Sequence, residues 1–353
     1  MSTYHEEQKT KETLRLREVQ KELPPFTQAF FRGIAQTTSP KTRLAYAYDL
    51  RIFFRYLYEE HRTLGGIEAK DFTASHLDAV TSEDIDCFLE YLSYYIRTDA
   101  EHPAAGKEMH NEEKGKSRKL AAVRMLFKYC YKKKLIRSDP AALVDTPKIH
   151  DKAIIRLDVN EVADLLDAVE SGEGLTDRQK AFHEKTKKRD LALMTLLLGT
   201  GMRVSECVGI NLKDLDFKNN AVKVTRKGGN EVFLYFNEEV RETLEVYLEE
   251  RKNMPTKETD EPALFLSGQG NRIGVRAVQN LVKKYANTVT LKKITPHKLR
   301  STFGTNLYQE TGDIYLVADV LGHADVNTTR KHYADIEDGR RRKAATRIKL
   351  RKD

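Results

Sequence analysis

Long hydrophobic runs are absent from this sequence of 353 residues, and cysteines are few. No segment approaches the roughly 18 uninterrupted apolar residues of a membrane-spanning helix. The N-terminus is charged where a secretory signal peptide would be apolar. These absences predict a cytoplasmic protein. Cys87, Cys130 and Cys207 are odd in number and lie in apolar helical patterns, so we expect buried thiols and no disulfide framework.

Two kinds of catalytic machinery are also missing. The sequence has no Walker-type loop that would bind a nucleotide phosphate. A metal-dependent phosphodiesterase could use His297, His323 and His332, but no carboxylate or cysteine accompanies them at ligand spacing. We therefore expect neither a metal nor another cofactor.

The positive charge is concentrated at one end of the chain. The net charge is +8, but residues 339–353 hold eight Lys or Arg against one Asp. The remainder is almost neutral, so the bulk charge is weak evidence for nucleic-acid binding. This basic tail is either a solvated terminus or a segment that contacts phosphates or docks on a neighbouring protomer.

Helical periodicity dominates the N-terminal part. After a charged leader at residues 1–25, apolar positions recur at helical spacing in KTRLAYAYDLRIFFRYLYEEHR. Thr81 and Asp84 have the spacing of a capping box, and SRKLAAVRMLFKYCYKKK predicts a further helix. Residues 26–145 are thus predicted to form a helical domain with basic faces that could hold DNA phosphates. The candidate DNA contacts, each with a solvated surface as its alternative, are Lys41, Arg43, Arg118, Lys119 and Arg124.

A second domain is predicted at residues 157–338, after an extended linker at residues 146–156. A capped helix starts at Asp158, and the charged stretch at 171–188 predicts an inserted loop or a short exposed helix. RDLALMTLLLGTG predicts a buried helix closed by glycines, and AVKVT and EVFLYF predict a hairpin. Helical patterns return from residue 273. The chain is therefore expected to be mainly helical, with a small antiparallel sheet in its second domain.

Six residues of the second domain suit one kind of chemistry. Several cations and a phenol are what an attack by tyrosine on a phosphodiester needs, because positive groups stabilise the charge that develops around phosphorus. Such a reaction cuts and rejoins nucleic acid without metal or nucleotide. The six residues, in the segments TGMRVSE, TRKGGNE, TPHKLRS and LGHADVNTTRKHY, are Arg203, Lys227, His297, Arg300, His323 and Tyr333.

The arginines and His297 have positions suited to binding an anion. Arg203 follows a Gly-Thr-Gly break at the start of a short helix, where its guanidinium could bond two phosphate oxygens or pair with Glu206. His297 and Arg300 are three residues apart, so both can reach the same phosphate from one helical face. Each of these signals is weak by itself.

The remaining three residues could move protons and attack. Lys227, in a glycine-rich turn, is a plausible general acid for the leaving 5′ oxygen. His323 could bond a nonbridging oxygen or help to deprotonate the nucleophile. Tyr333 is one of 16 tyrosines, and a phenol with a pKa of about 10 needs neighbouring cations or a proton acceptor to attack at neutral pH.

Taken together and in order, these motifs resemble the tyrosine recombinase family, also called phage-integrase-type recombinases, and within it the Xer group. The resemblance covers roughly residues 26–340. KTRLAYAYDLRIFFRYL and RKLAAVRMLFKYCYKKKLIRSDPAALVDTPK resemble its helical, SAM-like core-binding domain, and the six residues lie in segments that resemble its mixed α/β catalytic domain.

The resemblance implies roles for the six residues. Arg203 and Arg300 would bind the scissile phosphate, and Lys227 would protonate the leaving oxygen. His297 and His323 would assist. Tyr333 would form a 3′-phosphotyrosyl link to double-stranded DNA at a partly palindromic site. Four protomers would assemble and exchange strands pairwise through a Holliday junction, in chromosome-dimer resolution or in integration and excision of a mobile element, in some cases with accessory proteins.

One spacing departs from the family pattern. Family members commonly carry the tyrosine nine residues after the Gly-His histidine, where this chain has His332, and Tyr333 lies one residue further on. An extra residue in the connecting turn would absorb the difference. We also expect no separate arm-binding domain, and the sequence carries insertions at about 97–116 and 171–188; both features favour a simple Xer-like enzyme.

Two functions besides recombination remain open. A type IB topoisomerase-like enzyme would share the chemistry but relax supercoils, and a Holliday-junction resolution assay would separate the two. An accessory DNA-binding protein with an inactive site would belong to a different functional class, although every catalytic position is filled here.

Overall fold

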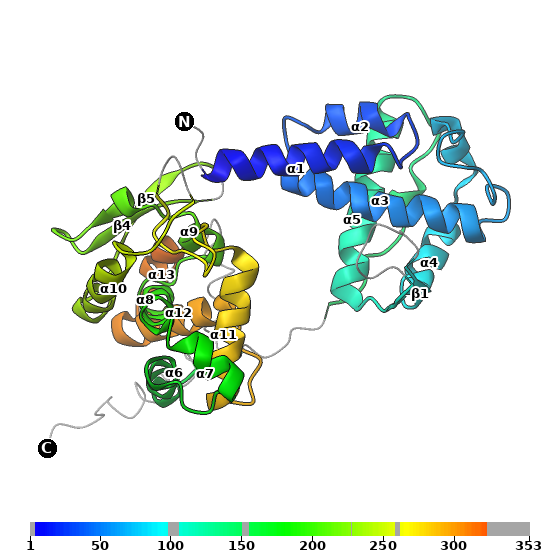
Figure 1. Ribbon diagram of the computed structural model, residues 1–353. Helices are drawn as coiled ribbons and strands as arrows, with labels where there is room; N and C mark the ends of the chain where they lie inside the picture. Colours follow the sequence, from blue (N-terminus) through cyan, green and yellow to red (C-terminus); the bar gives the residue numbers. More distant parts are fainter. Residues whose placement is uncertain (1–3, 98–105, 150–154, 227, 258–261, 323–353) are drawn as a thin grey trace, which may run out of the picture. The chain divides into compact units, whose positions relative to one another are not determined.

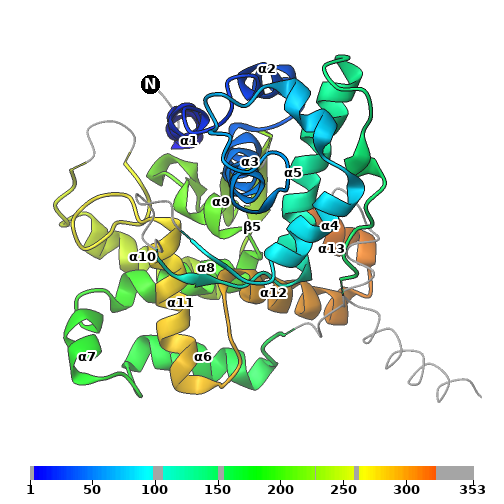
Figure 2. The same ribbon diagram turned by 90° about the vertical axis from the view of Figure 1, so that its right-hand side faces the viewer.

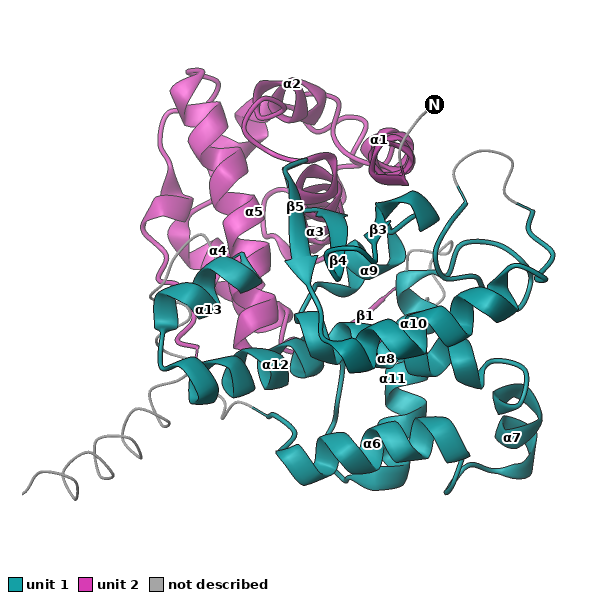
Figure 3. Ribbon diagram, turned by 90° about the vertical axis from the view of Figure 1, so that its left-hand side faces the viewer, with its two compact units in different colours: residues 1, 153–353 teal, residues 2–152 magenta. Residues whose placement is uncertain are grey.

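The computed structural model describes residues 4–97, 106–149, 155–226, 228–257 and 262–322 (Figure 1). The chain divides into two compact units, residues 2–152 and 153–353 (Figure 3). Lys227, His323 and Tyr333 lie outside the described residues, as does the basic tail at residues 339–353.

The N-terminal unit is helical, with one small β-hairpin. Its centre is the ring of Phe53 on α3, which lies 5.1 Å from the ring of Phe88 on α4 and 6.2 Å from that of Phe127 on α5. The helices and strands are α1 (Tyr4–Gln20), α2 (Thr27–Gly33), α3 (Pro40–Glu60), α4 (Ser82–Tyr91), β1 (Tyr95–Ile96), β2 (Glu108–Met109) and α5 (Glu113–Lys132). Short 3₁₀ turns lie at Ala74–Ala79 and Pro140–Ala142.

The predicted capping box at the start of α4 is confirmed. The backbone N–H of Asp84 donates to Thr81 Oγ1 over 3.2 Å, and the backbone N–H of Thr81 donates to Asp84 Oδ2 over 2.8 Å. Two otherwise unpaired donors are thereby satisfied at the helix end.

Before residue 26 the sequence predicts only a charged leader, whereas the structure has a helix there. α1 packs against α3, and its Leu16 and Val19 belong to the core of the N-terminal unit. Nearly every other position of α1 is polar. Two buried residues one turn apart allow α1 to pack against α3, but they are too few to produce a clear apolar stripe in the sequence.

The second unit is mainly helical with one antiparallel sheet. Most of α8 is buried, and it packs against α6, α10 and α12 (Figure 2). The helices and strands are α6 (Val159–Ser171), α7 (Asp177–His183), α8 (Lys187–Thr200), α9 (Val204–Val208), β3 (Leu215–Asp216), β4 (Ala221–Thr225), β5 (Glu231–Tyr235), α10 (Glu238–Arg251), α11 (Val275–Val289), α12 (Pro296–Thr311) and α13 (Ile314–Leu321). A 3₁₀ turn lies at Leu212–Asp214. The mainly helical fold class is confirmed.

The predicted hairpin is confirmed as β4 and β5, which pair from Ala221 opposite Tyr235 to Thr225 opposite Glu231. A short strand, β3, extends the sheet on the other side of β4. Inward-facing Val222 and Val224 are buried, while Lys223 is only partly buried. This alternation is the period-2 pattern of a sheet that covers a core with one face.

The insertion at 171–188 is more closely integrated than a loop or an exposed helix would be. It carries α7, whose His183 is only 1% exposed. The Nδ1 atom of His183 lies 3.0 Å from the hydroxyl oxygen of Tyr285, which in turn donates to Asp190 Oδ2 over 3.0 Å. A buried polar chain therefore fixes this insertion to α8 and α11.

The prediction of buried thiols is correct for Cys130 and Cys207 and wrong for Cys87, which is exposed. Ile85 and Phe88, three residues apart, form the buried face of α4. Cys87 follows Ile85 by two residues, a rotation of about 200°, and so points away from that face.

In the described part of the chain, no helix combines the length and apolar character that crossing a membrane would require.

Candidate active site

The glycine break predicted after α8 is a left-handed turn. Gly201 caps the helix with φ +61°, and its N–H donates to the carbonyl of Leu197 over 3.1 Å. A Cβ at this position would lie 2.3 Å from Phe303 Cδ1 and 3.0 Å from Leu321 Cδ2. Glycine thus satisfies the backbone angle and also lets the turn approach α12 and α13 closely.

Arg203 is held from two sides. Its Nη1 donates to Glu206 Oε1 over 2.8 Å, and the buried carboxylate of Glu206 also accepts the backbone N–H of Arg203 over 2.8 Å. The Nη2 atom donates to the carbonyl of Gly322 over 3.1 Å. The side chain is still 36% exposed, so an anion can approach a guanidinium whose position is already fixed.

Arg300 is buried, with only 4% of the residue exposed. Its Nη1 donates to the carbonyl of Gly201 over 2.8 Å, and its Nη2 donates to the carbonyl of Leu321. The second predicted phosphate-binding arginine therefore joins the turn after α8 to the end of α13.

A third arginine, which precedes Lys227 in the segment TRKGGNE but is not itself one of the predicted site residues, lies at the same place. Arg226 donates from Nη1 to the carbonyl of Asp319 over 3.3 Å and from Nη2 to that of Val320 over 2.7 Å. With Arg300 on Leu321 and Arg203 on Gly322, four successive carbonyls at the end of α13 each accept from a guanidinium.

This arrangement has a simple electrostatic cause. The last carbonyls of a helix lack intrahelical donors and carry the negative end of the helix dipole. They can therefore hold cations that would otherwise repel one another. The resulting cluster of positive charge is preorganised, and such a cluster stabilises the negative charge that develops in a phosphoryl-transfer transition state.

His297 lies in the first turn of α12, after Pro296, and is exposed. It precedes the buried Arg300 by three residues on the same helix, as predicted. Its backbone carbonyl accepts from Ser301 Oγ over 3.0 Å.

Two of the three predicted catalytic residues that lie outside the described residues, Lys227 and His323, directly follow described ones in the sequence. Lys227 directly follows Arg226, and His323 directly follows Gly322. An ideal Cβ on Gly322 would lie 2.3 Å from Nη1 of Arg226, so those two neighbours are in close approach. The structure thus gathers Arg203, Arg300 and the residues that flank Lys227 and His323; the assignment of Tyr333 remains a prediction.

The five candidate DNA contacts of the N-terminal unit differ in their surroundings. Lys119 is buried and donates to Asn111 Oδ1 over 2.6 Å, and burial lowers the pKa of its ammonium. Arg124 donates to the carbonyls of Ala141, over 3.1 Å, and Val144. These contacts favour structural roles for Lys119 and Arg124.

The other three cations are better suited to contact DNA. Lys41 is exposed at the start of α3, and Arg43 is partly exposed two residues later. Arg118 pairs with the buried Asp49, yet 52% of its side chain is exposed. We keep these three as the proposed phosphate contacts of the N-terminal unit.

Two residues that support the site escaped prediction as functional residues. Glu206 has a detectable signal, its spacing of three residues from Arg203 at a helix start. Arg226 lies beside Lys227 in the segment TRKGGNE, but no local pattern indicates its contacts, because its partners lie 93 and 94 residues away in the chain.

Comparisons with known proteins identify the family of this chain. Residues 155–340 match the model of the phage integrase family. The tyrosine recombinase XerC of Caldanaerobacter subterraneus subsp. tengcongensis is 32% identical over 336 residues, which cover 93% of this chain and 87% of that protein. The tyrosine recombinase XerS of Streptococcus agalactiae is 30% identical over 319 residues, covering 82% and 88%.

A solved structure shares the fold. The XerH site-specific recombinase, bound to palindromic difH substrate in a post-cleavage complex, superposes with a TM-score of 0.61 at 21% identity, over 89% of this chain and 81% of that one. The chain therefore belongs to the phage integrase family of tyrosine recombinases, in which it is Xer-like.

Proposed function

We propose that this protein is a site-specific recombinase that cleaves and rejoins double-stranded DNA through a 3′-phosphotyrosyl intermediate. The observation that carries the proposal is the convergence of Arg203 and Arg300 on the end of α13, immediately before His323 in the sequence. Two guanidiniums fixed by protein acceptors provide the preorganised charge that this chemistry requires.

The proposed reaction is a transesterification. Tyr333 gives its phenol proton to His323 or to water, and its oxygen forms a bond to the scissile phosphorus while the bond from phosphorus to the 5′ oxygen breaks. Lys227 gives its proton to that 5′ oxygen, and Arg203 and Arg300, assisted by His297 and His323, neutralise the nonbridging oxygens. Attack by another 5′ hydroxyl reverses these steps and joins the strands, so no external energy source is required.

We further propose a DNA-bound assembly. Four protomers would hold two partly palindromic sites and exchange strands in two steps through a Holliday junction, with accessory proteins in some contexts. The XerH structure, with its palindromic substrate, supports this form of site. The N-terminal unit would bind DNA phosphates through Lys41, Arg43 and Arg118, and a chromosomal or mobile-element substrate would place the protein in the cytoplasm.

The test begins with a site that the protein selects from random-sequence duplexes. A nicked duplex carrying this site should trap a denaturant-resistant adduct through a 3′ phosphate, in the presence of EDTA. A synthetic Holliday junction with two such sites should be resolved. Cleavage that disappears in EDTA would instead favour the metal-dependent phosphodiesterase.

The same assays distinguish a recombinase from a topoisomerase and from an accessory protein. A type IB topoisomerase-like enzyme would relax supercoiled DNA without resolving the junction, and an accessory protein would bind the duplex without forming an adduct. Chromosome-dimer resolution and integration or excision of a mobile element differ in the DNA around the encoding gene. A short inverted repeat beside that gene would favour a mobile element.

A further inference from the structure

The turn between β4 and β5 is closed by the backbone of Arg226. The N–H of Arg226 donates to the carbonyl of Asn230 over 2.8 Å, and its own carbonyl accepts from the N–H of Gly229 over 3.0 Å. Gly228 and Gly229 have φ values of +103° and +95°, and among the described residues no atom beyond their chain neighbours lies within 4 Å of the Cβ that a side chain would add there. The two glycines therefore do not fix the turn against a neighbouring element, whereas the side chain of Arg226 contacts the end of α13.

The side chain of Arg226 fixes this turn to the end of α13. Both Nη atoms donate to carbonyls there, at 3.3 Å and 2.7 Å. Nε is buried and finds no acceptor among the described residues.

The contact between Arg226 and the end of α13 requires glycine at position 322. The φ of Gly322 is +61°, which favours glycine, and an ideal Cβ would lie 2.3 Å from Nη1 and 2.5 Å from Cζ of Arg226. A side chain at position 322 would displace the guanidinium. Arg226, which precedes Lys227, therefore packs against Gly322, which precedes His323, and only a glycine at position 322 leaves room for the guanidinium.

We propose that Arg226 is a positioning residue for the cleavage reaction: it fixes the hairpin to α13 so that Lys227 delivers its proton to the leaving 5′ oxygen. The inference rests on the proposed function. A lysine on a turn of two glycines would otherwise sample many positions, and a displacement of about 1 Å can reduce a rate by about 10²-fold.

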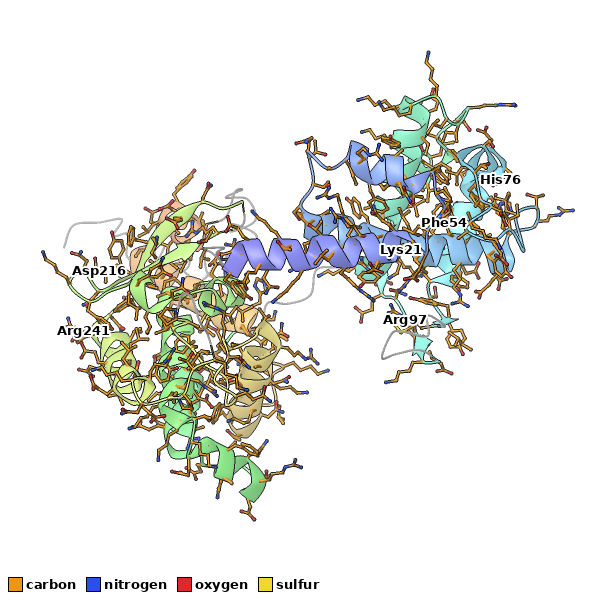
Figure 4. The ribbon with its side chains drawn as sticks, turned by 45° about the horizontal axis from the view of Figure 1, so that its top comes forward. Lys21, Phe54, His76, Arg97, Asp216 and Arg241 are labelled. Carbon is orange, nitrogen blue, oxygen red and sulfur yellow. The ribbon has the colours of Figure 1, made fainter. Side chains whose placement is uncertain are left out.

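The test compares Arg226→Ala and Arg226→Lys with a matched control, Arg241→Ala. Figure 4 shows Arg241 on α10, near Asp216 and the turn between β3 and β4. Its Nη1 lies 3.4 Å from the carbonyl oxygen of Phe217 and 3.4 Å from Asn220 Oδ1. Arg241 therefore supports the end of β4 opposite to Arg226, outside the proposed site.

The substrate is the nicked duplex that traps the covalent adduct, in two forms. In one form the scissile bond joins phosphorus to the ordinary 5′ oxygen; in the other a sulfur replaces that oxygen. A thiolate leaves readily without a proton because a thiol has a pKa near ~8.5, whereas an alkoxide needs a general acid. Single-turnover cleavage is measured together with duplex affinity and thermal unfolding.

We expect Arg226→Ala to cleave the oxygen substrate about 10²-fold more slowly than wild type, with affinity for the duplex unchanged. The sulfur substrate should restore the wild-type rate, Arg226→Lys should recover part of the oxygen rate, and Arg241→Ala should match wild type on both. Arg226→Ala cleaving the oxygen substrate at the wild-type rate would overturn the inference, as would an equal loss on both substrates.

A second variant covers the case in which Arg226→Ala does not fold. Arg226→Met keeps a side chain of similar length but removes every donor to the carbonyls of Asp319 and Val320, and it should show the same selective loss on the oxygen substrate; an equal loss on both substrates would contradict the inference. If wild-type protein forms no adduct with either substrate, the proposed function itself fails, and this outcome is distinct from failure of the role of Arg226.

Discussion

The Nη1 atom of Arg300 donates to the carbonyl of Gly201 over 2.8 Å, although 99 residues separate them in the sequence. This bond joins the His-x-x-Arg helix to the turn that precedes Arg203. Both predicted phosphate-binding arginines therefore depend on a turn that only glycine fits.

Replacing Gly201 should show this dependence. Gly201→Ala adds a Cβ that would lie 2.3 Å from Phe303 Cδ1, at a φ of +61°. Backbone strain and overpacking together should cost about 2–4 kcal/mol of unfolding free energy. Guanidinium-induced unfolding followed by circular dichroism measures this change. In the control, Gly66→Ala, φ is +79° and no atom of the described residues beyond the chain neighbours lies within 4 Å of the added Cβ, so only the strain of about 1–2 kcal/mol is expected. Equal costs at the two positions would contradict this account.

Alanine variants of Arg203 and Arg300 should differ in unfolding free energy but lose cleavage activity to a similar extent. Arg300→Ala leaves the buried carbonyls of Gly201 and Leu321 without a donor, which should cost about 2–3 kcal/mol, whereas Arg203→Ala, at a more exposed position, should cost less. Both variants should form the covalent DNA adduct about 10²- to 10³-fold more slowly. Unfolding curves and single-turnover cleavage measure the two effects. An Arg203→Ala protein with normal cleavage would remove Arg203 from the site.

Features that depend on neighbouring residues can be predicted from the sequence, whereas the contacts at the end of α13 cannot. The hairpin, the glycine break and the capping box depend on neighbouring residues, so local patterns predict them. The partners of Arg226 are 93 and 94 residues distant, and no local pattern marks them. Lys119 and Arg124 lie in a basic helical pattern, but their partners at Asn111, Ala141 and Val144 lie outside that helix. A charge pattern alone cannot distinguish such internal bonds from a DNA-binding face.

Asp49 should give the N-terminal unit an unusual pH dependence. Burial raises the pKa of Asp49 to about 6, although Arg118 and Lys119 oppose the change. The folded state therefore holds a proton more tightly than the unfolded state, and the unfolding free energy should rise as the pH falls from about 6 to about 4, by at most about 3 kcal/mol.

Asp49→Asn isolates this effect, because it removes the titrating group from both states. The difference in unfolding free energy between Asp49→Asn and wild type should shift in favour of the variant as pH rises from about 4 to about 7. Chemical unfolding at several pH values measures it. A difference that stays constant across this range would show that Asp49 has an ordinary pKa.

The three cysteines should differ in reactivity. In the native protein a thiol reagent should label only Cys87, since Cys130 and Cys207 are buried. Labelling should be slow near neutral pH because partial burial and the nearby carboxylates, Glu83 and Asp84 among them, raise the pKa of the Cys87 thiol. All three should react in guanidinium, and Cys87→Ser should abolish native labelling. Rapid native labelling of Cys130 or Cys207 would contradict their burial.

Identification of the residue that carries the DNA tests the central claim most directly. The adduct trapped on the nicked duplex is digested with protease and nuclease, and the modified peptide is sequenced by mass spectrometry. The phosphate should be found on Tyr333, and Tyr333→Phe should form no adduct while His332→Phe still forms one. Phosphate on another residue, or an adduct that persists in Tyr333→Phe, would contradict the proposed mechanism.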